Sequence, residues 1–492
     1  MPGGAETKGG RGGTAGRVAK NTLWLTAARI GCKFLSLPLV VILARYLGPQ
    51  GFGQWALLAS LVIILSAVAD GGFQIVTVRD LSAYPEKSGD YFRKTLSVRF
   101  ILILLAGLFM IVWGMTAEAD RAPLWLFAFG VILLLAEGLI KAGQAILSAR
   151  ERMDLTSGVS LLQALAATVL IGGLLLFGGG LFSAITGLAV VNLGAAALIL
   201  YLIRPYLFRD SIEERPAWKL LTEAFPYGIL TILTIIYFRI DVVMLSAMQG
   251  SQAAGQYNAA LRLFDSGLIL PTALAGALFP VMSRQLARNE KEGLLTSHRR
   301  AIHLLSLVGI PAAVGGWVYS DWLIGLFYGS AYAEAGPVLA LLSLGWVLFF
   351  INIPLGNLLA ASDLMARFVP FAAANTALNV VLNYLLIPRY GAVGAVIATL
   401  VCEVTGLAIQ FFFAWRILER RPPLPGLLVR PALASAALFG FWSWTSFLNP
   451  WISIPLGLAL YSILIILFRA FSAEDRAFLK RAILKMRDPE PA

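Results

Sequence analysis

Long apolar stretches, each about the length that crosses a lipid bilayer, follow one another along almost the whole chain. A spanning helix needs about 20 mostly apolar residues, because the hydrocarbon core is about 30 Å thick and each residue rises about 1.5 Å. In lipid the backbone must bond to itself, so such stretches fold as helices. The sequence therefore predicts an all-α, polytopic membrane protein with about 14 transmembrane helices. The predicted runs are 22–44, 53–78, 95–116, 123–148, 155–178, 180–203, 222–248, 253–283, 299–319, 335–361, 366–387, 391–415, 428–447 and 451–470.

The composition agrees with lipid as the solvent of this chain. Its residues are 59% hydrophobic and only 13% charged, whereas soluble domains carry about 45–50% apolar and about 25% charged residues. The net charge of +12 does not indicate a nucleic-acid partner, because the basic residues stand at the ends of apolar runs and form no aromatic-rich patch. With only two histidines, a His-rich metal centre or a His-based catalytic triad is not expected.

The positions of Lys and Arg orient the helices. If the N-terminus is cytoplasmic, only Arg45, Arg121 and Arg389 of the 39 basic residues fall in external connections. Six more lie inside the runs, and the others lie in cytoplasmic segments, as the positive-inside rule requires. One helix more or fewer would invert every later connection and remove this bias. We therefore expect a multi-pass protein of the cell (inner or cytoplasmic) membrane, in contact with membrane lipids and with both termini cytoplasmic.

A short motif occurs twice, in residues 47–58 and again in 249–260. At a constant offset of 202 the matched pairs are Gly48/Gly250, Gln50/Gln252, Gly53/Gly255 and Gln54/Gln256. Six helices separate the copies, so both have one orientation and two parallel six-helix lobes are expected. Chance similarity between two turns of small residues is the alternative. The expected division is a disordered cytoplasmic N-terminus (1–20), an N-lobe (21–210), a C-lobe (211–420), two peripheral helices (421–471) and a cytoplasmic amphipathic tail (472–492).

Four of the six cationic residues within the apolar runs are candidate site residues. A charge at mid-membrane costs about 2.5–3.5 kcal/mol on insertion scales, so each needs a partner or a function. Arg29 and Lys33 share a face of the first run, and Arg239 and Arg262 lie deep in the seventh and eighth. We interpret them as a binding site for a phosphate or pyrophosphate, whose oxygens a guanidinium group bonds in bidentate fashion. Internal ion pairing, for example of Arg262 with Asp265, is the alternative.

Three acidic residues within the runs are candidates for binding a coupling ion, H⁺ or Na⁺. They are Asp70, Glu137 and Glu403. Glu137 can instead form an ion pair with Lys141, four residues later on the same helical face.

Three asparagines, Asn375, Asn379 and Asn383, lie four residues apart on one face of the eleventh run. They form either part of a path for sugars or hydrogen bonds between helices, the more common use of amides in membranes. No phosphate-binding loop or zinc-protease signature is present in the sequence. The sequence predicts no catalytic residues, no metal site and no cofactor, and hence a transporter rather than an enzyme.

Several stretches carry a family resemblance: 44–53, 238–245, 255–262, 326–335, 379–388 and 390–399. They resemble the oligosaccharide flippase family (polysaccharide biosynthesis, O-antigen translocase), which belongs to the superfamily of multidrug, oligosaccharidyl-lipid and polysaccharide exporters. The resemblance covers roughly residues 20–420. It implies a cavity between helices 1–6 and 7–12 that opens alternately to the two sides of the membrane.

The resemblance also implies a cargo. It suggests a flippase for polyprenyl-pyrophosphate-linked oligosaccharide in capsule, exopolysaccharide or O-antigen synthesis, with polysaccharide polymerase and export proteins as partners. It assigns headgroup binding to Arg262 and, less directly, to Arg29. Two other functions remain open: a cation-coupled multidrug antiporter of the same superfamily, which the intramembrane cations disfavour, and a membrane glycosyltransferase or polymerase.

Overall fold

The computed structural model describes residues 11–116, 122–207, 215–419, 424–468 and 470, and for 11–30, 277, 280, 424 and 425 it describes the backbone only. Over these residues the regular structure is helical, without β-strands. The α-helices are α1 (Arg11–Asp70), α2 (Phe73–Ala83), α3 (Ser88–Thr116), α4 (Leu124–Ala149), α5 (Met153–Leu176), α6 (Leu181–Ile203), α7 (Ala217–Gln249), α8 (Ser251–Gly267), α9 (Ile269–Ala287), α10 (Lys291–Val318), α11 (Ser320–Tyr328), α12 (Ala335–Ala360), α13 (Met365–Leu418), α14 (Leu424–Trp444) and α15 (Pro450–Leu467).

Twelve helical spans in the described residues are long and apolar enough to cross a membrane. The difference from the predicted fourteen arises in α1 and α13, which each contain two predicted runs. In α1 the two runs meet at Gly48 (φ 66°, ψ 177°), and in α13 they meet at Gly391 (φ 55°, ψ −133°). Glycine is needed there, because other residues rarely adopt a positive φ. The predicted class, an all-α polytopic membrane protein, is confirmed.

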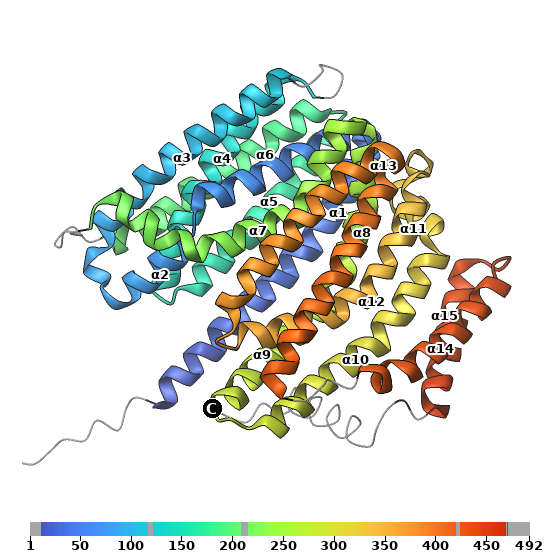
Figure 1. The fold of residues 1–492 in the computed structure, drawn as a ribbon. Coiled ribbons are helices and arrows are strands. Elements are labelled where there is room, and N and C mark those ends of the chain that lie inside the picture. The colour runs from blue at the N-terminus through green and yellow to red at the C-terminus, as the bar shows by residue number, and fades with distance from the viewer. Residues whose placement is uncertain (1–10, 117–121, 208–214, 420–423, 469, 471–492) are drawn as a thin grey trace, which may run out of the picture.

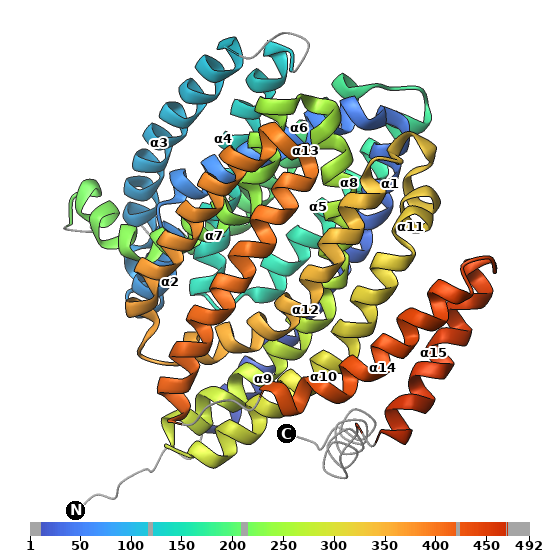
Figure 2. The same ribbon diagram turned by 45° about the vertical axis from the view of Figure 1, so that its right-hand side comes forward.

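The helices form two groups (Figures 1 and 2). Helices α3 to α6 lie together with the second half of α1, and α8 to α13 lie together on the other side, with α7 running between the groups. The last two helices, α14 and α15, pack on the outer side of α10 through Leu307, Tyr319, Trp442 and Tyr461. The predicted boundaries at 210/211 and 420/421, the first half of segment 1–20 and the tail 472–492 fall outside the described residues. The division into lobes therefore stays a prediction.

The two copies of the repeated motif pack directly against each other. Gly250 (φ 90°, ψ 172°) has nearly the same backbone conformation as Gly48, its match in the first copy. A Cβ atom added at Gly53 would overlap the carbonyl oxygen of Ser251, and one at Gly255 would overlap that of Pro49. The start of α8 thus contacts the second half of α1 backbone to backbone.

A second close contact joins the groups at the opposite end of the molecule. Gly72 (φ 92°) precedes α2, and a Cβ atom there would overlap the carbonyl oxygen of Ala224 in α7. Gly228, one turn further along α7, would meet the backbone of Gly71 in the same way. The two groups are therefore in contact both at the Gly48 end and at the Gly72 end.

Candidate functional site

A cavity of about 280 Å³ lies where α7, α8, α12 and α13 meet, with Ile63 of α1 in its wall. We call it the Arg239 cavity. Its other lining residues are Thr234, Ile235, Tyr237, Phe238, Arg239, Asp241, Tyr257, Leu261, Phe264, Asp265, Leu342, Phe349 and Thr399. The sequence places aromatic and aliphatic residues here among a few charged ones, which is the usual make-up of a small-molecule site.

Of the four predicted cationic site residues, Arg239 lines this cavity, whereas Arg262 is not one of its lining residues. Arg262 is within electrostatic reach of Arg239 and of Asp265, which lines the cavity one helical turn further on. The Nε atom of Arg262 is buried and makes no hydrogen bond. Neither arginine forms an ion pair within 4.0 Å among the described contacts. In the described part of the chain the two arginines therefore lack an ion pair, although Asp265 lies within electrostatic reach of Arg262 and Asp241 within electrostatic reach of Arg239.

Asp241, in the same cavity wall, was noted in the sequence only as a neighbour of Arg239. Its residue surface is 5% exposed, and Tyr257 donates a hydrogen bond of 2.6 Å to its Oδ2 atom. Thr399 donates a longer one, of 3.4 Å, to the same oxygen. The other oxygen, Oδ1, is buried without a partner. No spacing pattern could have indicated this group, because its three residues come from α7, α8 and α13.

A second cavity, of about 260 Å³, adjoins the first between α7, α12 and both halves of α13. We call it the Glu403 cavity. Glu403 is 6% exposed and accepts hydrogen bonds from Tyr237 Oη (2.6 Å) and Asn352 Nδ2 (2.7 Å). The two cavities share four lining residues: Thr234, Tyr237, Phe238 and Phe349. Neither Glu403 nor Asp241 has a cationic partner among the described contacts, although Arg239 is within electrostatic reach of Asp241.

The three predicted asparagines separate into two environments. Asn375 lines the Glu403 cavity, where it donates to the carbonyl oxygen of Cys402 (3.2 Å) and accepts from Thr405 Oγ1 (2.6 Å). Asn379 and Asn383 are 1% and 0% exposed, and Asn383 Nδ2 donates to Asn379 Oδ1 (3.1 Å). Their burial favours hydrogen bonding between side chains inside the helix packing over a path for sugars.

The remaining predicted site residues lie in the first group of helices. Asp70 forms a 2.6 Å ion pair with Arg99, which is only 2% exposed. Lys141 donates to Ser66 Oγ (3.0 Å), and the alternative Glu137–Lys141 pair is not among the described contacts. These residues surround a very small cavity. They do not meet the Arg239 cavity.

The two cationic residues of the first run stay apart from both cavities. Lys33 is exposed on α1, and it lines neither cavity. Arg29 lies in the part of α1 whose side chains are outside the described residues. Their role in headgroup binding therefore remains a prediction.

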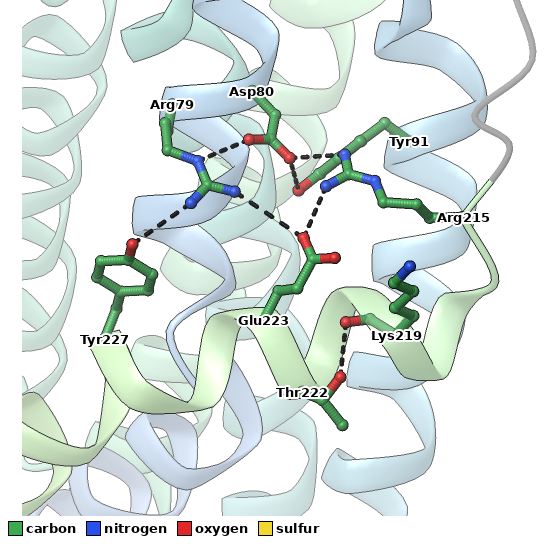
Figure 3. Close-up of polar contacts among 8 residues, drawn as sticks. All are labelled: Arg79, Asp80, Tyr91, Arg215, Lys219, Thr222, Glu223 and Tyr227. Carbon is green, nitrogen blue, oxygen red and sulfur yellow. Dashed lines mark hydrogen bonds and ion pairs between the residues drawn. The ribbon is translucent and has the colours of Figure 1, made fainter.

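An ion-pair network at the Gly72 end joins α2 to the start of α7 (Figure 3). We call Arg79, Asp80, Arg215 and Glu223 the interlobe network. Arg215 donates hydrogen bonds of 2.7 Å to both carboxylates, Asp80 and Glu223. Arg79 donates to Asp80 (2.8 Å) and lies 4.0 Å from Glu223. Each side thus supplies one arginine and one acid, and the charges balance.

Two tyrosines form hydrogen bonds with this network. Its arginines keep the Asp80 carboxylate ionised. Tyr91 and Tyr227 hydrogen-bond Asp80 and Arg79 at 3.3 and 3.4 Å. Burial of Asp80 favours its neutral form, but hydrogen bonds from Arg79 and Arg215 outweigh burial and lower its pKa below the ordinary value. Sequence reasoning counted Arg79 and Arg215 only as charges of cytoplasmic connections, because hydropathy does not pair residues of different helices.

Comparison with protein families places most of the chain. Residues 18–286 match the family described as polysaccharide biosynthesis protein, and residues 226–385 match the family described as MatE.

Relatives of similar length share low but extended identity with this chain. A probable low-salt glycan biosynthesis flippase of Haloferax volcanii is 23% identical over 474 residues, which cover 92% of this chain and 96% of that protein. The succinoglycan biosynthesis transport protein of Rhizobium meliloti is 26% identical over 337 residues, 66% of each chain.

Solved structures share the fold. The lipid II flippase MurJ in an inward closed conformation has a TM-score of 0.73 at 17% identity, covering 90% of this chain and 99% of that one. An inward-facing multidrug resistance MATE family transporter has a TM-score of 0.61 at 15% identity, covering 79% and 96%.

Proposed function

The chain belongs to the polysaccharide biosynthesis protein family, a family of membrane transporters within the multidrug and oligosaccharide exporter superfamily, and from this membership we propose its cargo and mechanism. The cargo is a polyprenyl-pyrophosphate-linked oligosaccharide, destined for capsule, exopolysaccharide or O-antigen. The chain carries it across the cytoplasmic membrane by alternating access. A polysaccharide polymerase and export proteins are the partners that such a cargo requires next.

The observation that carries this proposal is the pair Arg239 and Arg262. Two guanidinium groups within electrostatic reach of each other, without an ion pair, are costly in the low-dielectric interior. A pyrophosphate between or beside them would supply the direct ion pairs that Asp241 and Asp265 do not form with them, and guanidinium geometry suits its oxygens. Arg29 and Lys33, if they turn towards the same space in another conformation, would extend this site along α1.

Closure at both ends supports an alternating mechanism. At the Gly48 end, Arg45 donates to the carbonyl oxygens of Leu326 (2.6 Å) and Phe327 (2.8 Å) at the end of α11. At the Gly72 end, the interlobe network and the Gly72–Gly228 contact hold α2 against α7. In this proposal each closure opens in turn, and the cavities face one side at a time.

Coupling to an ion would give the movement a direction. Of the three candidates, Asp70 already pairs with Arg99, and Glu137 lines neither the Arg239 cavity nor the Glu403 cavity. Glu403 is buried beside the Arg239 cavity, and its hydrogen-bond donors are neutral. We therefore place H⁺ or Na⁺ coupling at Glu403 first.

The test replaces Arg262 by alanine in purified protein reconstituted with a fluorescent lipid-linked saccharide. Losing a charge-assisted bond to phosphate should reduce flipping about 10- to 100-fold, measured as saccharide that an impermeant hydrolase can reach. Arg288→Ala removes an exposed arginine paired only loosely with Glu290 (3.8 Å) and should leave the rate unchanged. Equal rates for native protein and Arg262→Ala would refute the headgroup role.

A cation-coupled multidrug antiporter is the second candidate, because residues 226–385 match the MatE family. The paired arginines oppose it, since they would repel a cationic drug. Efflux of a cationic dye from a sensitive host, lost in Glu403→Gln, would favour this function over the flippase.

A further inference from the structure

The Glu403 cavity differs in chemistry from the Arg239 cavity that it adjoins. No Lys or Arg lines it, and its one acid, Glu403, would repel a phosphate. Five aromatic rings are part of its wall, those of Tyr237, Phe238, Phe349, Phe368 and Phe371. The buried ring of Phe413 supports two of these rings edge to face, at 5.9 Å from Phe368 and 5.5 Å from Phe371. The cavity therefore offers fixed apolar faces and no site for an anion.

The unpartnered polar atoms in this wall are hydrogen-bond acceptors. Asn352 donates through Nδ2 to both the carboxylate and the carbonyl oxygen of Glu403, which fixes the amide and leaves its Oδ1 without a partner. Asn352 is 6% exposed. Gln410 Oε1 is likewise buried and unpartnered. Buried acceptors without donors are costly, so a ligand whose O–H groups reach these two oxygens would be favoured.

We propose that the Glu403 cavity binds a neutral sugar residue of the cargo, while the Arg239 cavity takes the pyrophosphate attached to it. This assignment rests on the proposed function. Aromatic faces and hydroxyl-accepting oxygens are what a sugar ring needs, and about 260 Å³ is close to the lower end, roughly 300 Å³, of ordinary ligand sites. In a lipid-linked saccharide the first sugar is bonded directly to phosphate. The two subsites must therefore adjoin, as these cavities do through Thr234, Tyr237 and Phe238.

The experiment compares two kinds of probe on the purified full chain in lipid nanodiscs. One is farnesyl pyrophosphate, and the other is a set of farnesyl-pyrophosphate-linked glucose, galactose and N-acetylglucosamine. At least one sugar-bearing probe should bind the native chain more tightly than farnesyl pyrophosphate. Phe371→Ala and Gln410→Ala should each lower the affinity for that probe about 3- to 10-fold and leave the affinity for farnesyl pyrophosphate unchanged. Arg239→Ala should lower the affinity for every probe.

Phe412→Ala is the matched control, because its ring lies on the same helix, is 43% exposed and does not line the cavity. It should change no affinity. The sugar subsite is refuted if no sugar strengthens binding to the native chain, or if the gain survives both cavity variants. If Phe371→Ala weakens farnesyl pyrophosphate equally, the cavity holds prenyl chain and the assignment is wrong. If no pyrophosphate probe binds the native chain, or Arg239→Ala leaves every affinity unchanged, the proposed function itself fails.

Discussion

Asp80 is the residue whose ionisation bears most directly on closure at the Gly72 end. Its pKa is lowered in the closed network, so it stabilises that state at pH values above the ordinary aspartate pKa of about 3.9. The contribution is lost only as the pH falls through the lower, closed-state value. We therefore expect closure to be insensitive to pH between 5 and 8 and to weaken below about pH 4.

This prediction can be read from the alkylation rate of a cysteine placed at Thr234, which lines both cavities, with Cys32 and Cys402 replaced by alanine. Asp80→Asn should raise the rate several-fold at neutral pH, because the arginines lose their shared acid. Glu290→Gln, which removes the acid of the exposed Arg288–Glu290 pair, should leave the alkylation rate unchanged. A native rate that climbs between pH 8 and 5 would contradict the assignment to Asp80.

For single residues, the sequence predicted which buried charges are energetically costly better than it predicted which residues contact each other. The deep arginines Arg239 and Arg262 were predicted as site residues because charge in an apolar run is expensive anywhere, and the structure places them close together. Asp241, Tyr237 and Asn352 could not be chosen in advance. Their importance depends on bonds between helices that are far apart in the chain.

Among the elements, the crossing of α1 and α8 depends on glycine. A methyl group at Gly53 has no room beside the Ser251 carbonyl, so Gly53→Ala should separate the helices, open the Gly48 end and reduce transport by more than half. Gly194→Ala, on α6 with nothing within 4 Å, should instead stabilise its helix by up to about 1 kcal/mol. Thermal unfolding and cysteine labelling from the Gly48 side would measure both. A Gly53→Ala variant with native labelling would show that the crossing tolerates a wider spacing.

The sequence predicted this crossing only in part. The offset of 202 matched Gly53 with Gly255, but a repeat does not say that its copies touch. The run 253–283 was predicted as one helix, whereas α8 ends at Gly267 and α9 begins at Ile269. Apolar character continues through this break, so hydropathy cannot detect it. Gly267 stands at this break, and a side chain there would meet the ring of Trp346.

For the whole molecule, the two closures differ in kind. The Gly48 end is held by backbone packing and by Arg45 on carbonyl oxygens, whereas the Gly72 end is held by a charge-balanced network with two acids. Among the described contacts only the second contains acids, so only the second can be weakened by protonation. A phosphate-bearing cargo arriving at that end would compete with Asp80 and Glu223 for the same arginines, so the end with the network is the one suited to loading.

Loading from the cytoplasm therefore requires the Gly72 end to be cytoplasmic, as the positive-inside distribution predicts. An impermeant thiol reagent on intact cells should label a cysteine at the exposed Gln50, near Gly48, and should not label one at the exposed Arg93 until the cells are permeabilised. Arg93 pairs only with Asp90 in its own helix (3.1 Å), so its replacement leaves the interlobe network intact. The reverse labelling pattern would place the acid-containing closure outside. The anion-competition step would then act on release of the cargo, and the assignment of the Gly72 end to loading would be wrong.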